Sequence, residues 1–196
     1  MDERQAHEER RTRETQVSVS LALDGSGEAS VATGIGFFDH MLESLARHAH
    51  FDLVVRASGD LRVDSHHTVE DVAAVLGAAL SSALGERLGI ERFGHSVVPM
   101  DESQAAAAVD CSGRGLGVIR ISLTGPGVGG IPGSLLAHFF EVLARTGQIT
   151  LHLTAAGADD HHVAEAAFKA TARALREAVR RDPALLGRAP STKGIL

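Results

Sequence analysis

The chain has 196 residues, of which 44% are hydrophobic, and its formal net charge at neutral pH is −6. This length and composition suit one domain or two closely packed small ones, and they exclude a disordered or fibrous protein. Acidic and basic residues are interspersed, so there is no basic stripe for nucleic acid. Apolar runs fall short of the roughly 18 residues of a membrane span, and the N-terminus lacks a hydrophobic signal core. We therefore expect a cytoplasmic protein with neither nucleic acid nor membrane as partner.

The first half of the chain predicts the order strand, strand, helix, strand, helix. Residues 1–13 are highly charged and lack periodicity, so we expect a mobile arm there. Residues 17–23 alternate as a half-buried strand, and a turn signal leads into residues 28–33 as the second arm of a hairpin. Three further elements follow: a helix at 37–48, a strand at 51–55 and a long helix at 67–88 that ends near Gly89.

The second half repeats this order. Its expected elements are a hairpin of 104–109 and 116–123, a helix at 134–146, a strand at 149–154 and a helix at 161–181. The glycine-rich residues 125–130 indicate a flexible loop. Several helices are rich in alanine and must pack closely against one another. We therefore expect an α+β fold with helices inside, sheets outside and sheet edges available for contacts between subunits.

The two halves also match residue by residue. His40 aligns with His138, and the register continues without a gap to Gly59 and Gly157. A loop difference of three residues then aligns the doublet His66-His67 with His161-His162. The chain 1–196 is thus expected to form a single domain of two pseudo-symmetric ββαβα repeats, about 14–95 and 96–185, that share one core.

Each histidine doublet is followed by a glutamate one helical turn later. The segments are Asp64-Ser-His66-His67-Thr-Val-Glu70 and Asp159-Asp160-His161-His162-Val-Ala-Glu165. The first histidine and the glutamate are i and i+4 and share a helix face. Adjacent helical residues point about 100° apart, so one doublet does not easily put both rings on one ion. The alternative is one ring in the core and one in solvent. The duplication favours metal, and two doublets favour two ions.

The available ligands are nitrogen and oxygen atoms. Cys111 is the single cysteine and is expected to be a buried, inert thiol. Imidazole and carboxylate ligands suit manganese, iron, nickel or zinc, whereas all-oxygen calcium sites are disfavoured. The sequence therefore predicts a transition-metal centre.

Several motifs in order resemble one enzyme family over nearly the whole chain. They are Arg11-Thr-Arg-Glu14-Thr15, Thr33 to Leu42 with Phe-Asp39-His40-Met, the segment Asp64 to Asp71, Arg92-Phe-Gly94-His95 with Pro99-Met-Asp-Glu102, Ser112-Gly-Arg114, Asp160 to Lys169, and Ser191-Thr-Lys193-Gly. By these motifs the chain resembles the imidazoleglycerol-phosphate dehydratases of histidine biosynthesis.

The resemblance implies a hydro-lyase with two Mn²⁺ ions per active site that converts D-erythro-imidazole glycerol phosphate to imidazole acetol phosphate. It also implies a fold similar to domain 2 of ribosomal protein S5. The family forms an octahedral homo-oligomer whose assembly depends on metal and whose active sites lie between subunits. The ligand positions implied here are His40, His66, His67, Glu70, His138, His161, His162 and Glu165.

The hydrogen removed from the substrate is not activated by a carbonyl group, so the imidazole ring must act as the electron sink. A metal-bound imidazolate that passes through a diazafulvene-like intermediate would do this. Glu14 matches the family's proton-transfer position, with Glu102 as a reserve, and the ligands Glu70 and Glu165 belong to the catalytic set. By itself, Glu14 could equally be a solvated carboxylate on the arm.

Cations and hydroxyl groups are also needed for the substrate's phosphate. The matching positions are Arg92, Arg114, Lys169, Ser191 and Lys193, and Glu14 is a further substrate-binding position. Ser44 stands where the family usually has glutamine, so one substrate contact is expected to be missing or mediated by water. Two rival functions remain: metal-assisted hydrolysis of a small phosphorylated compound, and a non-catalytic scaffold in which ions only join subunits.

Overall fold

The structure is a computed structural model that describes residues 4–185 and 187–192. In the first half the elements are β1 Gln5–Arg11, β2 Thr15–Ala22, β3 Ala29–Ala32, α1 Gly36–Ala49, β4 Asp52–Gly59 and α2 His66–Leu84. In the second half they are β5 Phe93–Met100, β6 Ser103–Asp110, β7 Leu116–Ser122, β8 Gly127–Val128, β9 Ile131–Pro132, α3 Gly133–Thr146, β10 Thr150–Ala156 and α4 Asp160–Ala178.

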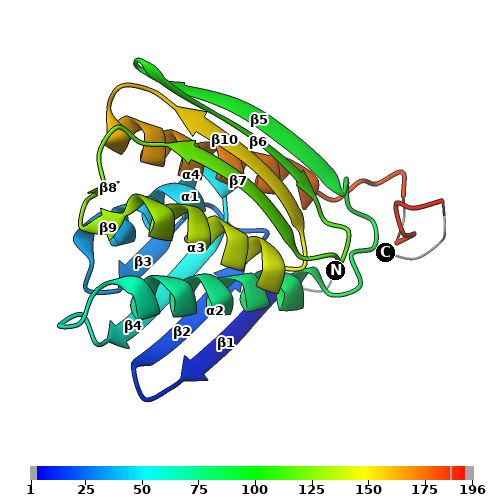
Figure 1. Ribbon diagram of the computed structural model, residues 1–196. Helices are drawn as coiled ribbons and strands as arrows, with labels where there is room; N and C mark the ends of the chain where they lie inside the picture. The colour runs from blue at the N-terminus through cyan, green and yellow to red at the C-terminus, as the bar shows by residue number, and fades with distance from the viewer. Residues whose placement is uncertain (1–3, 186, 193–196) are drawn as a thin grey trace.

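Two four-stranded sheets enclose a layer of helices (Figure 1). Helices α1 and α2 cover the sheet of the first half, and α3 and α4 cover the sheet of the second half. Across the middle, α2 packs on α3 and α1 packs on α4. One cluster of buried apolar side chains includes residues of both halves. The predicted α+β class, the layering and the shared core are confirmed.

The expectation of a mobile arm at 1–13 is wrong for residues 5–11, which form the edge strand β1. This strand pairs antiparallel with β2, from Gln5 opposite Ala22 to Arg11 opposite Gln16. Its contacts with α2 are polar, because Glu8 accepts a hydrogen bond from Ser82 and Arg10 pairs with Asp71. Charged side chains thus face the helix in place of the apolar alternation by which a strand is usually found in a sequence.

Both predicted hairpins pair the wrong strands. The sheet orders are β1-β2-β4-β3 and β5-β6-β10-β7, so β4 lies between β2 and β3, and β10 between β6 and β7. Strands β3 and β7 instead run parallel to β4 and β10. The true hairpins are β1–β2 and β5–β6. The four-stranded sheet of each half thus has one more strand than ββαβα provides, and the second half has the short strands β8 and β9 in addition. Because β5 belongs to the second sheet, the halves divide before Phe93, and not at 95–96.

Helix packing is close, as the alanine-rich sequences predicted. A Cβ atom at Gly77 of α2 would lie 2.0 Å from Oγ1 of Thr146 and 2.7 Å from the backbone nitrogen of Gly147. Helix α2 ends at Leu84, before the predicted Gly89. Its cap, Gly85, has a φ of +53° and a ψ of −127°, a backbone conformation that glycine adopts readily.

Three smaller features complete the fold. The predicted flexible loop at 125–130 contains most of a short hairpin, in which Gly127 pairs with Pro132 and Val128 with Ile131. Cys111 is buried as expected, and burial raises the pKa of its thiol to about 12. Within the described residues, no helix has the length and apolar character to cross a membrane.

Candidate metal centre

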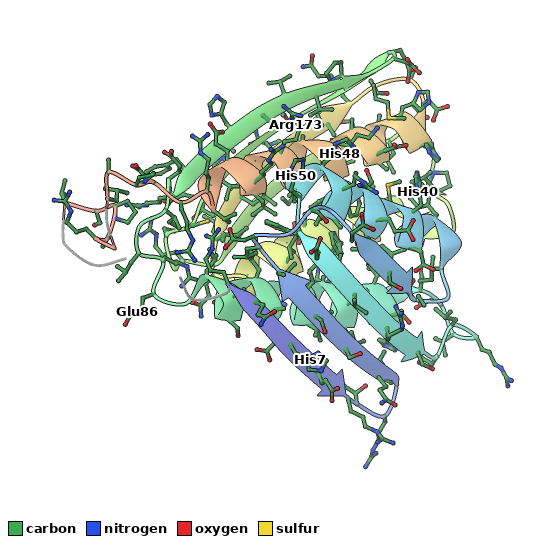
Figure 2. All side chains as sticks on the ribbon, turned by 180° about the vertical axis from the view of Figure 1, so that it is seen from behind. His7, His40, His48, His50, Glu86 and Arg173 are labelled. Atoms are coloured by element: carbon green, nitrogen blue, oxygen red, sulfur yellow. The ribbon has the colours of Figure 1, made fainter. Side chains whose placement is uncertain are left out.

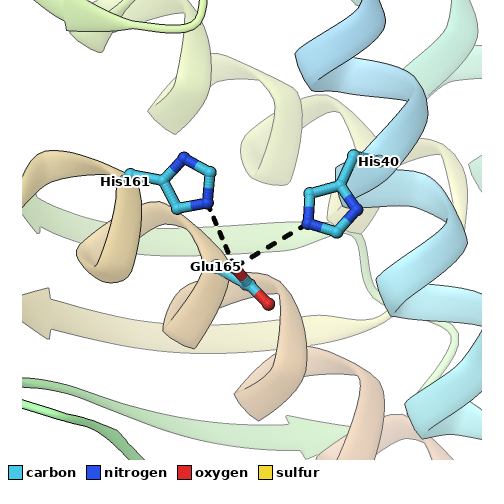
Figure 3. Close-up of side chains that lie close together, drawn as sticks. All are labelled: His40, His161 and Glu165. Atoms are coloured by element: carbon cyan, nitrogen blue, oxygen red, sulfur yellow. Dashed lines mark ion pairs between the residues drawn. The ribbon is translucent and has the colours of Figure 1, made fainter.

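The first cluster of possible metal ligands joins two helices that come from different halves of the chain. His40 lies on α1, and His161 and Glu165 lie on α4 (Figure 3). Oε2 of Glu165 is 3.2 Å from Nε2 of His161 and 3.8 Å from Nε2 of His40. One ligand atom from each residue lies within 4.8 Å of the others. A single ion can therefore be shared by two imidazoles and one carboxylate.

The second cluster has the same composition and joins α2 to α3. His66 and Glu70 lie on α2, and His138 lies on α3. Glu70 is 3.3 Å from Nε2 of His138 through Oε1 and 3.7 Å from Nε2 of His66 through Oε2. The two rings are stacked with centroids 5.7 Å apart. In this cluster, too, one ligand atom from each of the three residues lies within 4.8 Å of the other two.

Both clusters combine the two halves. Each pair of histidine and glutamate on the last helix of one half receives its third ligand from the first helix of the other half. The duplication predicted all six residues, but not this exchange, because the exchange depends on α1 packing against α4 and α2 against α3. Neither half alone contains a complete cluster.

The start of each ligand helix is fixed by an aspartate. The side chain of Asp159 accepts hydrogen bonds from the backbone nitrogens of His161 and His162, at 2.8 and 3.3 Å. Asp64 accepts one from the backbone nitrogen of His66 at 2.8 Å. Such caps satisfy backbone donors at a helix N-terminus, and here they hold the backbone of the first histidine in each doublet.

The second histidine of each doublet lies outside these two clusters and is held by its own carboxylate. Nδ1 of His67 is 3.1 Å from Asp60, and Nδ1 of His162 is 3.0 Å from Glu102. The hydrogen bond with Asp60 raises the pKa of His67, and the one with Glu102 raises the pKa of His162. A carboxylate on Nδ1 orients an imidazole so that Nε2 can bind a metal. The sequence analysis missed Asp60, which no motif spacing marks.

The remaining neighbours of His67 and His162 are carboxylates in the turns of the two true hairpins. Nε2 of His67 is 3.8 Å from Glu14, and Nε2 of His162 is 4.0 Å from Asp101. Asp101, Glu102 and His162 form a third group with ligand-like spacing. Glu102 is engaged otherwise, since it accepts hydrogen bonds from Ser103 and the backbone of Asp159.

Glu14 and Glu102 occupy equivalent places, each directly before the second strand of its hairpin, but their surroundings differ. Hydrogen bonds from Ser103, His162 and the backbone lower the pKa of Glu102 to about 2. Glu14 is exposed, and within the described residues its carboxylate has only His67 nearby. Glu14 is therefore free to exchange a proton with a bound molecule, whereas Glu102 supports His162.

A row of polar residues continues from the first cluster along the seam between α1 and α4. Nζ of Lys169 is 2.8 Å from Oε1 of Glu165. Burial alone would raise the pKa of Glu165, but Lys169, His40 and His161 outweigh it, so the pKa is lowered. Burial and the charges of Lys169 and Arg173 lower the pKa of His48, and Figure 2 shows His48 and Arg173 close together. The sequence analysis assigned no role to His48 or Arg173.

Three other predicted phosphate-binding residues gather elsewhere in the chain. Arg92 pairs with Asp110 at 2.7 Å and donates to the carbonyl of Pro190, beside Ser191, and Arg114 reaches the same aspartate at 3.4 Å. The backbone of Arg92 donates a hydrogen bond to the last residue of α4. At 1.5 Å per residue, that end of the helix lies about 27 Å from its start, where His161 belongs to the first cluster. Lys193 lies outside the described residues. Among the members of this set that the structure describes, Lys169 is the one that lies next to a cluster.

Ser44, on the same seam, is buried, and its hydroxyl has no hydrogen-bond partner within the described residues. The expected loss of a substrate contact at this position stays a prediction. The donor set of both clusters fits a borderline divalent ion, since it contains imidazole nitrogens and a carboxylate and no thiolate.

Comparison with known proteins agrees with this arrangement. A sequence model of imidazoleglycerol-phosphate dehydratase matches residues 33–175. This chain belongs to the imidazoleglycerol-phosphate dehydratase family. Relatives named imidazoleglycerol-phosphate dehydratase from Methanoculleus marisnigri and Acidiphilium cryptum are each 55% identical, and each match covers 95% of this chain and 96% of the relative.

Solved structures of dehydratases share the fold. Imidazoleglycerol-phosphate dehydratase from Staphylococcus aureus has a TM-score of 0.81 at 31% identity, over 90% of this chain and 99% of that one. IGPD from Pyrococcus furiosus in complex with (S)-C348 has a TM-score of 0.82 at 34% identity, over 96% and 99%. The dehydratase matches thus include both halves and both clusters.

Proposed function

We propose that this protein removes water from D-erythro-imidazole glycerol phosphate to give imidazole acetol phosphate, a step of histidine biosynthesis in the cytoplasm. The observation that carries the proposal is the pair of clusters, each with two histidines and one glutamate from both halves of a chain that belongs to the dehydratase family. A non-catalytic scaffold would need neither an exposed Glu14 next to a held imidazole nor a cationic row beside a cluster.

Manganese is the proposed ion in both clusters, which the six residues His40, His161, Glu165, His66, Glu70 and His138 would hold. When bound, Mn²⁺ would act as a Lewis acid that makes the substrate's imidazole a better electron sink. The hydroxyl group on the carbon attached to the imidazole leaves as water with a proton supplied by an acid of the protein, a base of the protein takes the proton from the neighbouring carbon, and the resulting enol becomes the ketone.

Glu14 is the proposed base. It is exposed, close to His67, and not held by any hydrogen bond to its carboxylate within the described residues. Its carboxylate would accept the proton from the carbon next to the one that loses its hydroxyl group. Glu70 and Glu165 belong to the catalytic set as metal ligands and not as bases, because the carboxylate of each lies between two histidines of its cluster.

The cationic row beside the first cluster suits the substrate's phosphate. Lys169 lies next to Glu165, and Arg173 continues the row by one helical turn. His48 has a lowered pKa and would remain neutral and able to donate a hydrogen bond. A substrate with its imidazole at the ligands and its phosphate toward Lys169 would satisfy both ends.

Self-association would supply the remaining residues. Nδ1 of His67 and of His162 is held by a carboxylate, which leaves Nε2 of each ring available. We infer that each completes a metal site in a second copy, and that Arg92, Arg114, Ser191 and Lys193 reach a neighbouring active site in the same way. This agrees with an octahedral homo-oligomer whose active sites lie between subunits.

Incubation of the manganese-loaded protein with imidazole glycerol phosphate tests the reaction. Mass spectrometry should detect a product lighter than the substrate by one water, with the phosphate still attached. Release of inorganic phosphate would support the rival hydrolase. Tight metal binding with an unchanged substrate would support the scaffold.

A further inference from the structure

The hairpin of β8 and β9 has no role in the proposed function, yet it is attached beside the first cluster. Asp160, the residue before His161, accepts hydrogen bonds from the backbone nitrogen and hydroxyl of Thr124, at 2.7 and 2.9 Å, and from the backbone nitrogen of Gly125 at 2.8 Å. The two backbone donors are the main reason that the pKa of Asp160 is lowered. The segment leading into the hairpin is therefore anchored at the first turn of α4.

The tip of the hairpin lies directly on Phe37. Gly129 has a φ of +59°, and a Cβ atom there would lie 2.1 Å from Cγ, 2.3 Å from Cβ and 2.5 Å from Cδ1 of Phe37. A contact under 3.0 Å is too short for real Cβ atoms. Because Cβ of Phe37 is fixed to the backbone of α1, a side chain at Gly129 would move either the hairpin tip or the first turn of that helix.

Phe37 in turn contacts His161 of the first cluster and lies on α1, the helix that carries His40. Its ring meets the ring of His161 edge to face, with centroids 5.4 Å apart and an interplanar angle of 65°. Aromatic pairs of this kind have a preferred geometry and restrict ring orientation. Phe37 also precedes His40 by three residues on α1, so both residues lie on neighbouring faces of the same turn.

We propose that Gly129 and Phe37 are positioning residues for the first cluster. The glycine tip holds Phe37 in place, and Phe37 fixes the ring of His161 and the first turn of α1 that carries His40. In the register of the duplication, the counterpart of Phe37 is Leu135, so the second cluster has no equivalent ring. The inference rests on the proposed function, because it requires that the first cluster binds metal.

A manganese titration of the full-length chain tests this inference, with free Mn²⁺ measured by electron paramagnetic resonance. The variants are Gly129→Ala and, as a matched control, Gly130→Ala. Gly130 has a φ of +82°, and an added Cβ would meet nothing within 4 Å. Both variants therefore carry left-handed backbone strain, but only Gly129→Ala pushes against Phe37.

The wild type is expected to bind two ions per chain. In Gly129→Ala one of the two sites should weaken by about 10–100-fold, the usual loss when a residue that orients a ligand is changed, while Gly130→Ala keeps both affinities. Phe37→Leu removes the ring edge but leaves an apolar side chain, and it should weaken the same single site. Circular dichroism checks that each variant is folded.

The outcomes separate the inference from the proposed function. If the wild type binds two ions and all variants bind them equally well, the positioning role is overturned and the metal centre stands. If the wild type binds no Mn²⁺, the proposed function fails and the inference fails with it. Should Gly129→Ala not fold, the isotherm of Phe37→Leu decides: loss of one site supports the inference, and two unchanged sites contradict it.

Discussion

At the scale of single residues, two equivalently placed glutamates have different partners. Glu102 is held by Ser103, by the backbone of Asp159 and by His162. Glu14 has one loose neighbour, His67, at 3.8 Å. A proton-transfer group must be free to meet the substrate, so of these two glutamates Glu14 is the one proposed as the base.

Replacing Glu14 should separate chemistry from metal binding. Glu14→Gln is expected to lower kcat by about 10²–10⁴-fold, the usual contribution of a general acid or base, while the Mn²⁺ content remains that of the wild type. Glu102→Gln should instead reduce metal content, because it loosens His162. Steady-state kinetics with metal analysis of the same samples measures both effects. Full activity of Glu14→Gln would remove it from the mechanism.

The pKa values of His67 and His162 predict how metal binding depends on pH. Only a neutral imidazole binds a divalent ion. Carboxylate partners raise both pKa values, so protons compete with the ion at a higher pH than they would for an unpaired imidazole, and the competition ends as the pH rises. Mn²⁺ occupancy should therefore fall on acidification. Asp60→Asn removes one cause of the raised pKa and should shift the loss of occupancy to lower pH; an unchanged midpoint would contradict this explanation.

At the scale of elements, the second cluster depends on the spacing of α2 and α3. Gly77 allows the two helices to approach, because an added Cβ would lie 2.0 Å from Thr146. Gly77→Ala should lower the free energy of unfolding by about 1–3 kcal/mol through overpacking. For a chain of this size, each kcal/mol lost lowers Tm by about 2–4 °C. Gly36→Ala, whose added Cβ meets nothing within 4 Å, is the control in thermal unfolding. Equal Tm values for the two variants would refute the packing argument.

The sequence predicted these elements better than it predicted their partners. Helical periodicity located all four helices to within a few residues. Strand alternation found β2 and β3, but the turn at 24–27 suggested a hairpin, whereas β3 pairs parallel with β4 across a helix. β1 was missed because Glu8 and Arg10 face α2 through polar contacts, a pattern that apolar periodicity does not detect.

At the scale of the whole molecule, the duplication allowed the ligand residues to be predicted, and tertiary packing decides how they combine. His40 and His138 were expected from their alignment, yet each completes the cluster of the other half. His67 and His162 lie apart from both clusters, as the angle of about 100° between adjacent helical residues indicated. Asp60 and Phe37 were missed because their roles depend on contacts between segments that no motif connects.

Assembly should depend on the second histidine of each doublet. His67→Ala and His162→Ala are each expected to lower Mn²⁺ content and to shift the protein toward smaller species, because each ring would complete a metal site in a second copy. His152→Ala, an exposed histidine on β10 outside the clusters, is the control. Size-exclusion chromatography with light scattering measures the mass. An unchanged mass in both cluster variants would contradict metal-dependent assembly.

The central claim is a manganese-dependent dehydration. The most direct test strips the protein with a chelator and measures the conversion of imidazole glycerol phosphate to imidazole acetol phosphate before and after Mn²⁺ is added. We predict no turnover by the stripped protein and full turnover after reloading. A reloaded, assembled protein that forms no imidazole acetol phosphate would contradict the claim, and equal turnover by the stripped protein would contradict its dependence on metal.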